Sequence, residues 1–246
     1  MATKPQVSVV LIAYNEEKYL PQALASIKRQ TFQDIEIIVV DNNSTDKTAA
    51  IAKKLGAKVI PESIQGMTPA RETGFAAACA PIIVKIDADT VLDSRWIEIA
   101  LKFFTSHPTA VGIRGSFSLK KSTKLGQFFF KNITQPGYYW QARLLAGHHV
   151  LTGPVYAIRK SAWEKIRVHR NDRLVHEDID LTCHLCEFGT IHRHPKLVSY
   201  WSDRRLKQPP QKVIFDFYDY YRRFFQTVFL HHPRLRRHQS HFGMAH

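Results

Sequence analysis

Short runs of valine and isoleucine recur through the first part of the chain and are separated by longer amphipathic segments. Each run is apolar at consecutive positions, as in strands that are buried on both faces of a sheet. The runs are Val7–Ala13, Ile35–Asp41, 58–60 and Ile82–Asp87. Between them, apolar residues at helical spacing, such as Leu20, Leu24 and Ile27, predict helices. Because parallel strands need such crossovers, the pattern predicts an α/β fold with a mostly parallel sheet flanked by helices.

Polar residues that commonly cap helices precede these amphipathic segments. Their side chains accept hydrogen bonds from the first free backbone N–H groups of a helix. The expected caps are Asn15, then Ser44 or Thr45, and then Thr68 ahead of Pro69. We expect the second helix to end at Gly56 and the third to run through Cys79.

The pattern is less regular after Asp89. Its periodicity predicts helices at 94–106, 161–166 and 178–188, and strands at 110–117, 156–159 and 191–194. Two aromatic segments, 128–130 and 138–140, fit neither period. A last helix is expected from Pro210, where aromatic residues are interleaved with Arg222 and Arg223. After Pro233 we expect a frayed tail.

Composition and charge narrow the class of protein. A hydrophobic share of 44% and a charged share of 23% exclude disorder as the default state. No uncharged run reaches the roughly 18 residues that a membrane-spanning helix needs. Three cysteines favour a reducing compartment over a disulfide framework, so we expect a cytoplasmic protein. The net charge of +14 favours a polyanionic partner: nucleic acid, acidic lipid or a phosphorylated substrate.

The aromatic and basic C-terminal segment has three interpretations. Residues 202–246 contain nine Lys or Arg and three Asp, a net charge of +6. The helix within this segment can pack against the rest of the protein as core. It can also lie on the surface of an anionic membrane, with its apolar face toward the lipid. A nucleic-acid surface is the third interpretation, but no recognised reading module accompanies it.

Acidic and polar residues follow three of the predicted strands. Asp41 ends the second strand, Glu16 follows the first, and Asp87-Ala88-Asp89 follows the fourth. Ligands bind at the carboxyl ends of strands in open parallel sheets. A pair of carboxylates leaving a strand suits Mg²⁺ or Mn²⁺, which prefer oxygen ligands and keep positions open for phosphate. No glycine-rich phosphate loop follows the first strand, so cationic side chains such as Arg71 and Lys85 are expected to help hold phosphate.

Four segments, in this order, resemble motifs of the family 2 glycosyltransferases of the GT-A fold. The first is the opening from Val7 through Tyr14-Asn15-Glu16 to Ile38-Val39-Val40-Asp41-Asn42-Asn43-Ser44-Thr45-Asp46. Ala70-Arg71-Glu72-Thr73-Gly74 resembles the family's Ala-Arg-Asn-x-Gly segment, with Glu72 in place of Asn. Lys85-Ile86-Asp87-Ala88-Asp89 resembles its DxD motif, and His176-Glu177-Asp178 resembles its Glu-Asp acceptor motif. The resemblance extends from about Val7 to Phe188.

The resemblance implies a set of donor-binding residues. Tyr14 packs on the base of a nucleotide-sugar, Asp41 accepts a hydrogen bond from it, and Glu16 lines the same pocket. Arg71 contacts the nucleotide side. Asp87 meets the ribose, and Asp87 and Asp89 are the metal ligands, with Asp89 on the metal that bridges the diphosphate. Ala13, Lys85 and Ala88 complete the implied substrate-binding set.

The resemblance also implies the reaction. Asp178 is the implied catalytic base, with Glu177 beside it. An inverting transfer needs a base for the acceptor hydroxyl and a Lewis acid for the departing diphosphate. The implied organisation is a catalytic domain at 1–205, divided into a nucleotide-sugar half at 1–118 and an acceptor half at 119–205. Residues 206–246 form the basic C-terminal helix and tail.

The implied enzyme uses a nucleotide-diphosphate sugar, UDP-linked rather than GDP-linked, with Mn²⁺ or Mg²⁺. Its acceptor is a saccharide or a lipid-linked saccharide of the cell envelope, with peripheral contact to the inner face of an anionic membrane and no nucleic acid. The Gln-x-x-Arg-Trp motif of processive synthases is absent, so we expect non-processive transfer. Two alternatives remain open: a nucleotidyltransferase of the sugar-phosphate type, and a non-enzymatic basic protein that binds RNA or lipid.

Overall fold

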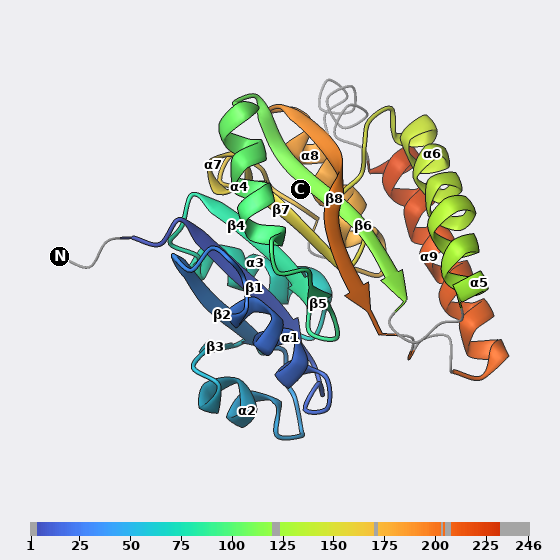
Figure 1. Cartoon of the computed structure of the whole chain (residues 1–246). Helices are drawn as coiled ribbons and strands as arrows, with labels where there is room; N and C mark the ends of the chain where they lie inside the picture. Colours follow the sequence, from blue (N-terminus) through green and yellow to red (C-terminus); the bar gives the residue numbers. More distant parts are fainter. Residues whose placement is uncertain (1–3, 120–123, 170–171, 203, 205–207, 232–246) are drawn as a thin grey trace, which may run out of the picture.

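The computed structural model describes residues 4–119, 124–169, 172–202, 204 and 208–231, and Figure 1 shows the chain coloured along its sequence. One eight-stranded sheet runs through the described part in the order β3-β2-β1-β4-β7-β6-β8-β5. Its strands are β1 (Val7–Ala13), β2 (Ile35–Asp41), β3 (Lys58–Pro61), β4 (Ile82–Asp87), β5 (Val91–Leu92), β6 (Ala110–Leu119), β7 (Val155–Arg159) and β8 (Thr190–Trp201). The mixed sheet flanked by helices confirms the predicted fold class.

The first four strands to appear in the sequence form the parallel half of the sheet. β1 pairs in parallel with both β2 and β4, and β2 pairs in parallel with β3. Every residue of β1 is buried. Strands covered on both faces have no polar alternation, which is why the continuous valine and isoleucine runs predicted them almost to the residue.

The other half of the sheet is mixed. β7 is antiparallel to both β4 and β6, β8 is parallel to β6, and β5 is antiparallel to β8. β8 is much longer than the predicted 191–194 strand. Its pairing with β6 shifts register between Arg114, which is opposite Arg193, and Ser116, which is opposite Val198. Pro195 lies in this irregular stretch, where a missing N–H is tolerated, and it hides the strand's continuity from pattern analysis.

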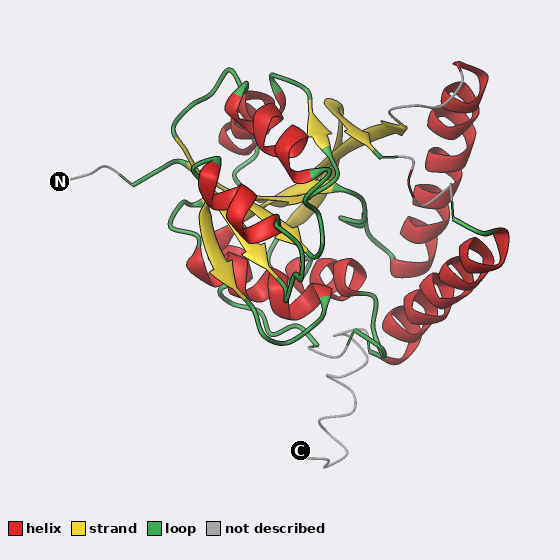
Figure 2. Cartoon of the chain, turned by 90° about the horizontal axis from the view of Figure 1, so that it is seen from below, coloured by secondary structure: helices red, strands yellow, loops and turns green. Residues whose placement is uncertain are grey.

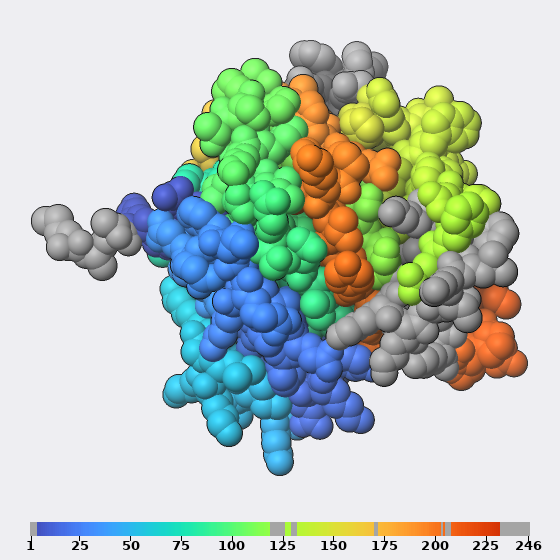
Figure 3. Space-filling view, in the orientation of Figure 1, coloured from blue at the N-terminus to red at the C-terminus, as the bar shows by residue number. Residues whose placement is uncertain are grey.

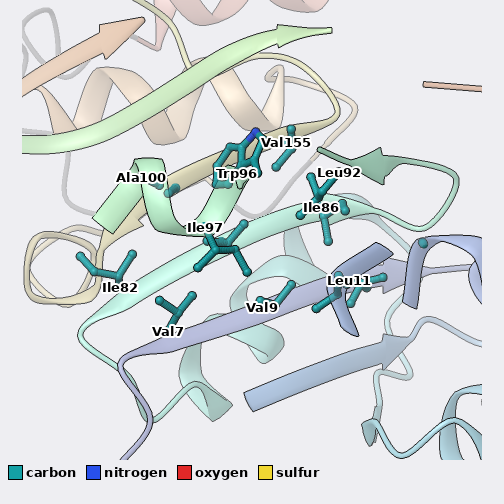
Figure 4. Packing of buried hydrophobic residues seen from close by; sticks show 14 of the residues in the cluster. Val7, Val9, Leu11, Ile82, Ile86, Leu92, Trp96, Ile97, Ala100 and Val155 are labelled. Carbon is teal, nitrogen blue, oxygen red and sulfur yellow. The ribbon is translucent and has the colours of Figure 1, made fainter. Parts of the chain in front are cut away.

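Three helices cover one face of the sheet: α1 (Leu20–Lys28), α2 (Thr48–Lys54) and α4 (Trp96–Ser106). Their apolar sides join alternate residues of β1, namely Val7, Val9 and Leu11, in one buried cluster. Figure 4 shows this packing, with Trp96 and Ile97 of α4 over the strands. The cluster holds the parallel strands in place and so fixes the positions of their carboxyl ends.

The opposite face is covered by α3 (Met67–Ala77), α7 (Lys160–Trp163) and α8 (Glu177–Leu185). α3 lies very close to the sheet at Gly74, where an added Cβ would be 2.4 Å from Cγ1 of Val10. A glycine is therefore needed at this position for the helix to approach. This close packing sets the depth of α3, which also carries Arg71.

The predicted helix caps are wrong, although the helices exist. The N-cap residues of α1, α2 and α3 are Tyr19, Lys47 and Gly66. Asn15 and Ser44 instead connect two loops, as described below. α3 ends at Ala77 rather than Cys79, and α4 begins at Trp96 rather than at residue 94. The side-chain oxygens of Asn15 and Ser44 accept hydrogen bonds from backbone N–H groups of the neighbouring loop, and this competes with capping.

A helical layer lies beyond the sheet at one end of the molecule (Figures 1, 2 and 3). It consists of α5 (Lys124–Phe129), a π-helical segment (Phe130–Thr134), α6 (Gln135–Ala146) and α9 (Pro210–Leu230). The aromatic segments that fit neither period therefore lie in helices. α9 begins at Pro210, as predicted, whereas the tail after Pro233 lies outside the described residues. Buried residues of α6, α8 and α9 form one small core, so the layer is attached to α8.

Candidate active site

The register of the sheet brings the predicted donor-site residues to one edge. Ala13 pairs with Asp41, and Ile12 pairs with Asp87. Because these strands are parallel, the residues that follow them emerge on the same side. Glu16 and Asp89 lie just beyond this level and are almost completely buried. The carboxyl ends of β1, β2 and β4 therefore form a single acidic edge.

The loops after β1 and β2 are joined by reciprocal hydrogen bonds. The backbone N–H of Asn15 donates to Oγ of Ser44 (3.0 Å), and the N–H of Thr45 donates to Oδ1 of Asn15 (2.8 Å). Asp41 accepts a hydrogen bond from the N–H of Ser44 (3.2 Å). Tyr14 remains half exposed beside this loop pair. The arrangement leaves an aromatic ring and a carboxylate at the mouth of the acidic edge.

Arg204 is the cation that balances part of this edge. Its Nη1 and Nη2 donate to the two carboxylate oxygens of Glu16, at 2.8 and 2.6 Å, and its Nε lies 3.0 Å from Oδ2 of Asp89. Burial raises the pKa of Glu16, and the charges of Asp89 and Asp87 raise it further, although Arg204 acts in the opposite direction. Glu16, Asp87 and Asp89 thus influence one another electrostatically and need a positive charge nearby.

Lys85 is a second buried cation at the same edge. It is 2% exposed and its Nζ lies 2.6 Å from Oδ1 of Asp87. Burial alone would lower the pKa of Lys85, but the carboxylates of Asp87 and Asp178 outweigh it, and the pKa is raised. Lys85 therefore remains protonated and links the donor-side carboxylates to Asp178 electrostatically.

The carboxylates of this edge suit a hard divalent cation. Their oxygen atoms are the ligand type that Mg²⁺ and Mn²⁺ prefer, and their mutual repulsion favours a bound cation. Within the described ranges, no group of three or more His, Cys, Asp or Glu side chains is arranged to hold a metal by itself. A metal held by Asp89 would consequently need further oxygen ligands from a bound diphosphate.

Asp178 lies at the start of α8, and its charge interacts with that of Lys85. It is 5% exposed, and its Oδ1 makes no hydrogen bond within the part of the chain that the structure describes. Nη1 of Arg71 lies 4.0 Å from this oxygen and donates to the carbonyl of Glu177 at 2.9 Å. The structure therefore places Arg71, expected on the nucleotide side, beside Asp178.

The two adjacent carboxyls have opposite environments. Burial raises the pKa of Asp178, against the lowering effect of Lys85, and the neighbouring charge of Glu177 raises it further. The pKa of Glu177 is lowered, because His176 and Arg223 together outweigh its burial. Oε2 of Glu177 lies 3.4 Å from Nη1 of Arg223 and 3.7 Å from Nδ1 of His176. Glu177 is thus paired with Arg223, while Asp178 is the carboxyl suited to gain and lose a proton.

Sequence analysis missed several residues of this site. Arg204 comes from a short segment after β8, and Arg223 comes from α9. The ring of Tyr156, on β7, lies 5.4 Å from Nζ of Lys85. No sequence motif surrounds these residues. The only signals were the basic character of the segment after 202 and the strand prediction that contained Tyr156.

Comparisons with known proteins identify relatives of this chain. The sequence model of the family described as "Glycosyl transferase family 2" matches residues 8–167. Glycosyltransferase GlyA of Streptococcus pneumoniae is 28% identical over 144 residues, which are 56% of this chain and 20% of that protein. The probable glycosyltransferase YdaM of Bacillus subtilis is 28% identical over 206 residues, which are 77% of this chain and 48% of that protein. The chain therefore spans less than half the length of these relatives.

Solved structures share the fold at low sequence identity. TarS 1–349 of Staphylococcus aureus superposes with a TM-score of 0.64 at 20% identity, covering 89% of this chain and 72% of that one. Glucosyl-3-phosphoglycerate synthase of Mycobacterium tuberculosis, in complex with Mn²⁺, UDP and phosphoglyceric acid, gives 0.63 at 18% identity, covering 86% and 74%. These likenesses confirm the fold, and the family match confirms the resemblance found in the sequence.

Proposed function

The chain belongs to glycosyl transferase family 2, and from this membership we propose that it transfers a sugar, with inversion, from a nucleotide-diphosphate sugar to an acceptor hydroxyl. The observation that carries the proposal is that Lys85 pairs with Asp87 and also interacts electrostatically with Asp178. Asp87 and Asp89 lie toward the donor edge, and the buried Asp178 lies toward α8. A displacement reaction needs these two functions close together but separate.

The donor edge supplies binding and orientation. In this proposal Tyr14 packs on the base, Asp41 accepts a hydrogen bond from it, and Ala13 and Glu16 line the pocket. Asp87 meets the ribose, next to Ala88, and Asp89 and Asp87 hold a divalent metal. When bound, Mn²⁺ or Mg²⁺ supplies Lewis-acid stabilisation of the diphosphate leaving group. Mn²⁺ and UDP are present in a structural neighbour of this chain, which supports this choice of metal and nucleotide.

The acceptor side supplies the base. The acceptor hydroxyl gives its proton to Asp178 as its oxygen forms a bond to the anomeric carbon. The bond from that carbon to the diphosphate breaks on the opposite face, and the diphosphate leaves with the electron pair. Lys85 and Arg71 favour the ionised form of Asp178, because their positive charge opposes the effect of burial on its pKa. Glu177, paired with Arg223, holds the start of α8 in position.

The proposed roles are assigned to successive segments of the chain. Residues 1–118 bind the donor in this proposal, residues 119–205 contribute the acceptor side, and residues 206–246 add the basic C-terminal helix and tail. The acceptor is a saccharide, free or lipid-linked, of the kind used in cell-envelope polysaccharides, and transfer is non-processive. A lipid-linked acceptor would bring the protein to an anionic membrane surface on the cytoplasmic side.

A donor panel tests this proposal against its alternatives. UDP- and GDP-sugars are incubated with the protein, with and without Mn²⁺, and the released nucleotide is identified by chromatography. Metal-dependent release of UDP is expected. Formation of UTP and sugar 1-phosphate from a UDP-sugar, only when pyrophosphate is added, would indicate a nucleotidyltransferase instead. No turnover of any donor, with or without a saccharide acceptor, would favour a non-enzymatic binding protein.

A further inference from the structure

Large apolar side chains are exposed mainly in one place. Seventeen large hydrophobic residues are exposed in the described part of the chain, and eleven of them lie within 128–144 or 214–230. These two ranges are the helical layer of α5, α6 and α9 (Figures 1 and 2). Single exposed hydrophobic residues are normal on a protein surface, but a concentration of this kind marks a surface that binds something.

The exposed residues follow the helical repeat. Around α6 they are Ile133, Trp140 and Leu144, which are seven and four residues apart and share one face. On α9 they are Ile214, Tyr218, Phe225 and Phe229, which recur at the same kind of spacing. We call these seven residues the outer apolar face. Trp140 is 69% exposed and Phe229 is 53% exposed, so neither helix buries its stripe within the described structure.

Contacts between the two helices show that both stripes face the same way. The line of contact between α6 and α9 is called the seam here. The hydroxyls of Tyr138 and Tyr220 form a hydrogen bond on the side of this seam nearer the core. Gln141 and Tyr221 meet on the side farther from it, where the Tyr221 hydroxyl donates to Oε1 of Gln141 at 3.4 Å. On each helix, the exposed stripe lies next to this outer contact, on the side away from the core. The two stripes therefore adjoin one another across the seam.

The outer apolar face is connected to the acceptor side of the site. Nη1 of Arg223, on α9, contacts Oε2 of Glu177, and the N–H of His176 donates to Oγ1 of Thr227, also on α9, at 2.8 Å. The rings of His176 and Tyr220 lie 4.6 Å apart. His176 stands two residues before Asp178, the proposed base. The charge of Asp178 is one of the causes that raise the pKa of Tyr220. Whatever α9 binds is held next to the position where the acceptor must enter.

We propose that the outer apolar face binds the surface of an anionic lipid bilayer, and that the acceptor is consequently a saccharide carried on a membrane lipid. The second part rests on the proposed function. Aromatic and aliphatic side chains on an amphipathic helix insert into the boundary between headgroups and acyl chains. No helix in the described ranges is long and apolar enough to cross a membrane.

The charge of the chain favours lipid over another occupant. The protein carries +14 overall, and three arginines, Arg234, Arg236 and Arg237, follow α9 in the sequence. Basic residues near an anionic bilayer contribute attraction that an uncharged partner would not provide. A second copy of this chain would instead carry the same positive charge, which opposes association through this face.

Vesicle flotation tests the proposal directly. The full chain is mixed with phosphatidylcholine vesicles, with or without phosphatidylglycerol, and the bound fraction is measured. Binding is expected only with phosphatidylglycerol, together with a blue shift of tryptophan fluorescence that Trp140→Phe reduces. The double variant Tyr218→Gln/Phe229→Gln should bind on the order of 10-fold more weakly per aromatic ring removed. Phe188→Gln, which removes an exposed aromatic ring elsewhere, should bind like the wild type.

Three results would overturn the proposal. Equal binding of the double variant and the wild type would show that another surface meets the lipid. No binding to either vesicle would exclude the membrane. Suppose that the vesicles fail to bind and that light scattering detects a dimer of the wild type but not of the double variant. A second copy of the chain would then cover the outer apolar face. Transfer to a soluble saccharide acceptor is measured in parallel and should be unchanged in the double variant. This control distinguishes a failure of the membrane proposal from a failure of the proposed transferase activity.

Discussion

Arg204 and Glu16 form a two-point ion pair between residues 188 positions apart in the sequence. The same guanidinium lies 3.0 Å from Asp89 through its Nε. One side chain therefore supplies positive charge to both buried carboxylates at the position where a donor-bound metal is proposed. This ion pair partly neutralises the acidic edge of the donor-free protein.

Removal of Arg204 should therefore strengthen metal binding in the absence of donor. In Arg204→Ala the carboxylates of Glu16 and Asp89 lose their internal cation, and a divalent ion no longer competes with it. We expect Mn²⁺ affinity to rise on the order of 10-fold after screening by solvent. Electron paramagnetic resonance of free Mn²⁺ measures this change. Arg95→Ala, at an exposed arginine paired with Glu98, is the control, and weaker Mn²⁺ binding by Arg204→Ala would contradict the competition.

Asp89→Asn should lose metal-dependent activity. The substitution keeps the shape of the side chain but removes the charge that binds the metal, so turnover of the donor should fall on the order of 10²-fold or more. Folding should be retained, since relief of repulsion among Glu16, Asp87 and Asp89 leaves no cavity. Steady-state rates are compared with those of Asp93→Asn, a carboxylate at the start of α4. Near-normal rates in excess Mn²⁺ would remove Asp89 from the metal site.

Asp41→Ala should affect the donor more than the acceptor. A contact to the base is made equally in the ground state and in the transition state, so its loss raises the donor KM and leaves kcat nearly unchanged. Asp41 also accepts a hydrogen bond from the N–H of Ser44. Asp41→Asn keeps one acceptor oxygen for this loop contact and loses the second, so it separates the effect on the loop from the effect on base recognition. Initial rates at varied donor and acceptor concentrations give both constants. Equal increases in the two KM values would place Asp41 outside the base pocket.

The pH dependence of transfer should report the charge of Lys85. The base is active when ionised, so activity is present above the pKa of Asp178 and is lost as the pH falls through it. Burial raises this pKa and Lys85 lowers it, so Lys85→Met should move the acid limb of kcat to higher pH. Lys102→Met, at an exposed lysine paired with Glu98, should leave the limb in place. A limb that stays fixed in Lys85→Met would show that Asp178 does not control it.

The sequence predicted the parallel half of the sheet well because β1 and β4 are buried along almost their whole length. Continuous apolar runs such as Val7–Ala13 leave no other structure that could bury them. The caps were wrong because Asn15 and Ser44 bond to each other's loops, a tertiary preference that local patterns do not contain. β8 was underestimated because its irregular middle, with Pro195, interrupts the strand pattern.

Asp41, Asp87, Asp89 and Asp178 were predicted as site residues because they stand at the end of a strand or begin a helix with a recognisable motif. Arg71 and Lys85 were predicted as the cationic side chains near them, and these roles stay predictions. Arg204 was not predicted, since its partners Glu16 and Asp89 come from the far end of the chain and no spacing rule connects them. The position of Arg71 beside Asp178 likewise depends on how closely α3 packs against the sheet at Gly74. Tertiary packing determines these relationships.

The central claim is that Asp178 is the base of a sugar transfer. Asp178 and Glu177 are adjacent at the start of α8, and adjacent helical residues point about 100° apart, so only one can reach the anomeric carbon. Glu177 is paired with Arg223 and lies close to His176, whereas Asp178 has the raised pKa of a carboxyl that can accept a proton. A positioned base contributes roughly 10²–10⁴-fold to the rate.

The most direct measurement is the transfer rate of Asp178→Asn beside that of Glu177→Gln, with donor binding followed by calorimetry in the presence of metal. We predict that Asp178→Asn abolishes transfer while its donor affinity stays within a few-fold of the wild type, and that Glu177→Gln has the milder defect. Normal transfer by Asp178→Asn with an inactive Glu177→Gln would exchange the two roles. Normal transfer by both variants would contradict the account, because the acceptor site would then lie elsewhere.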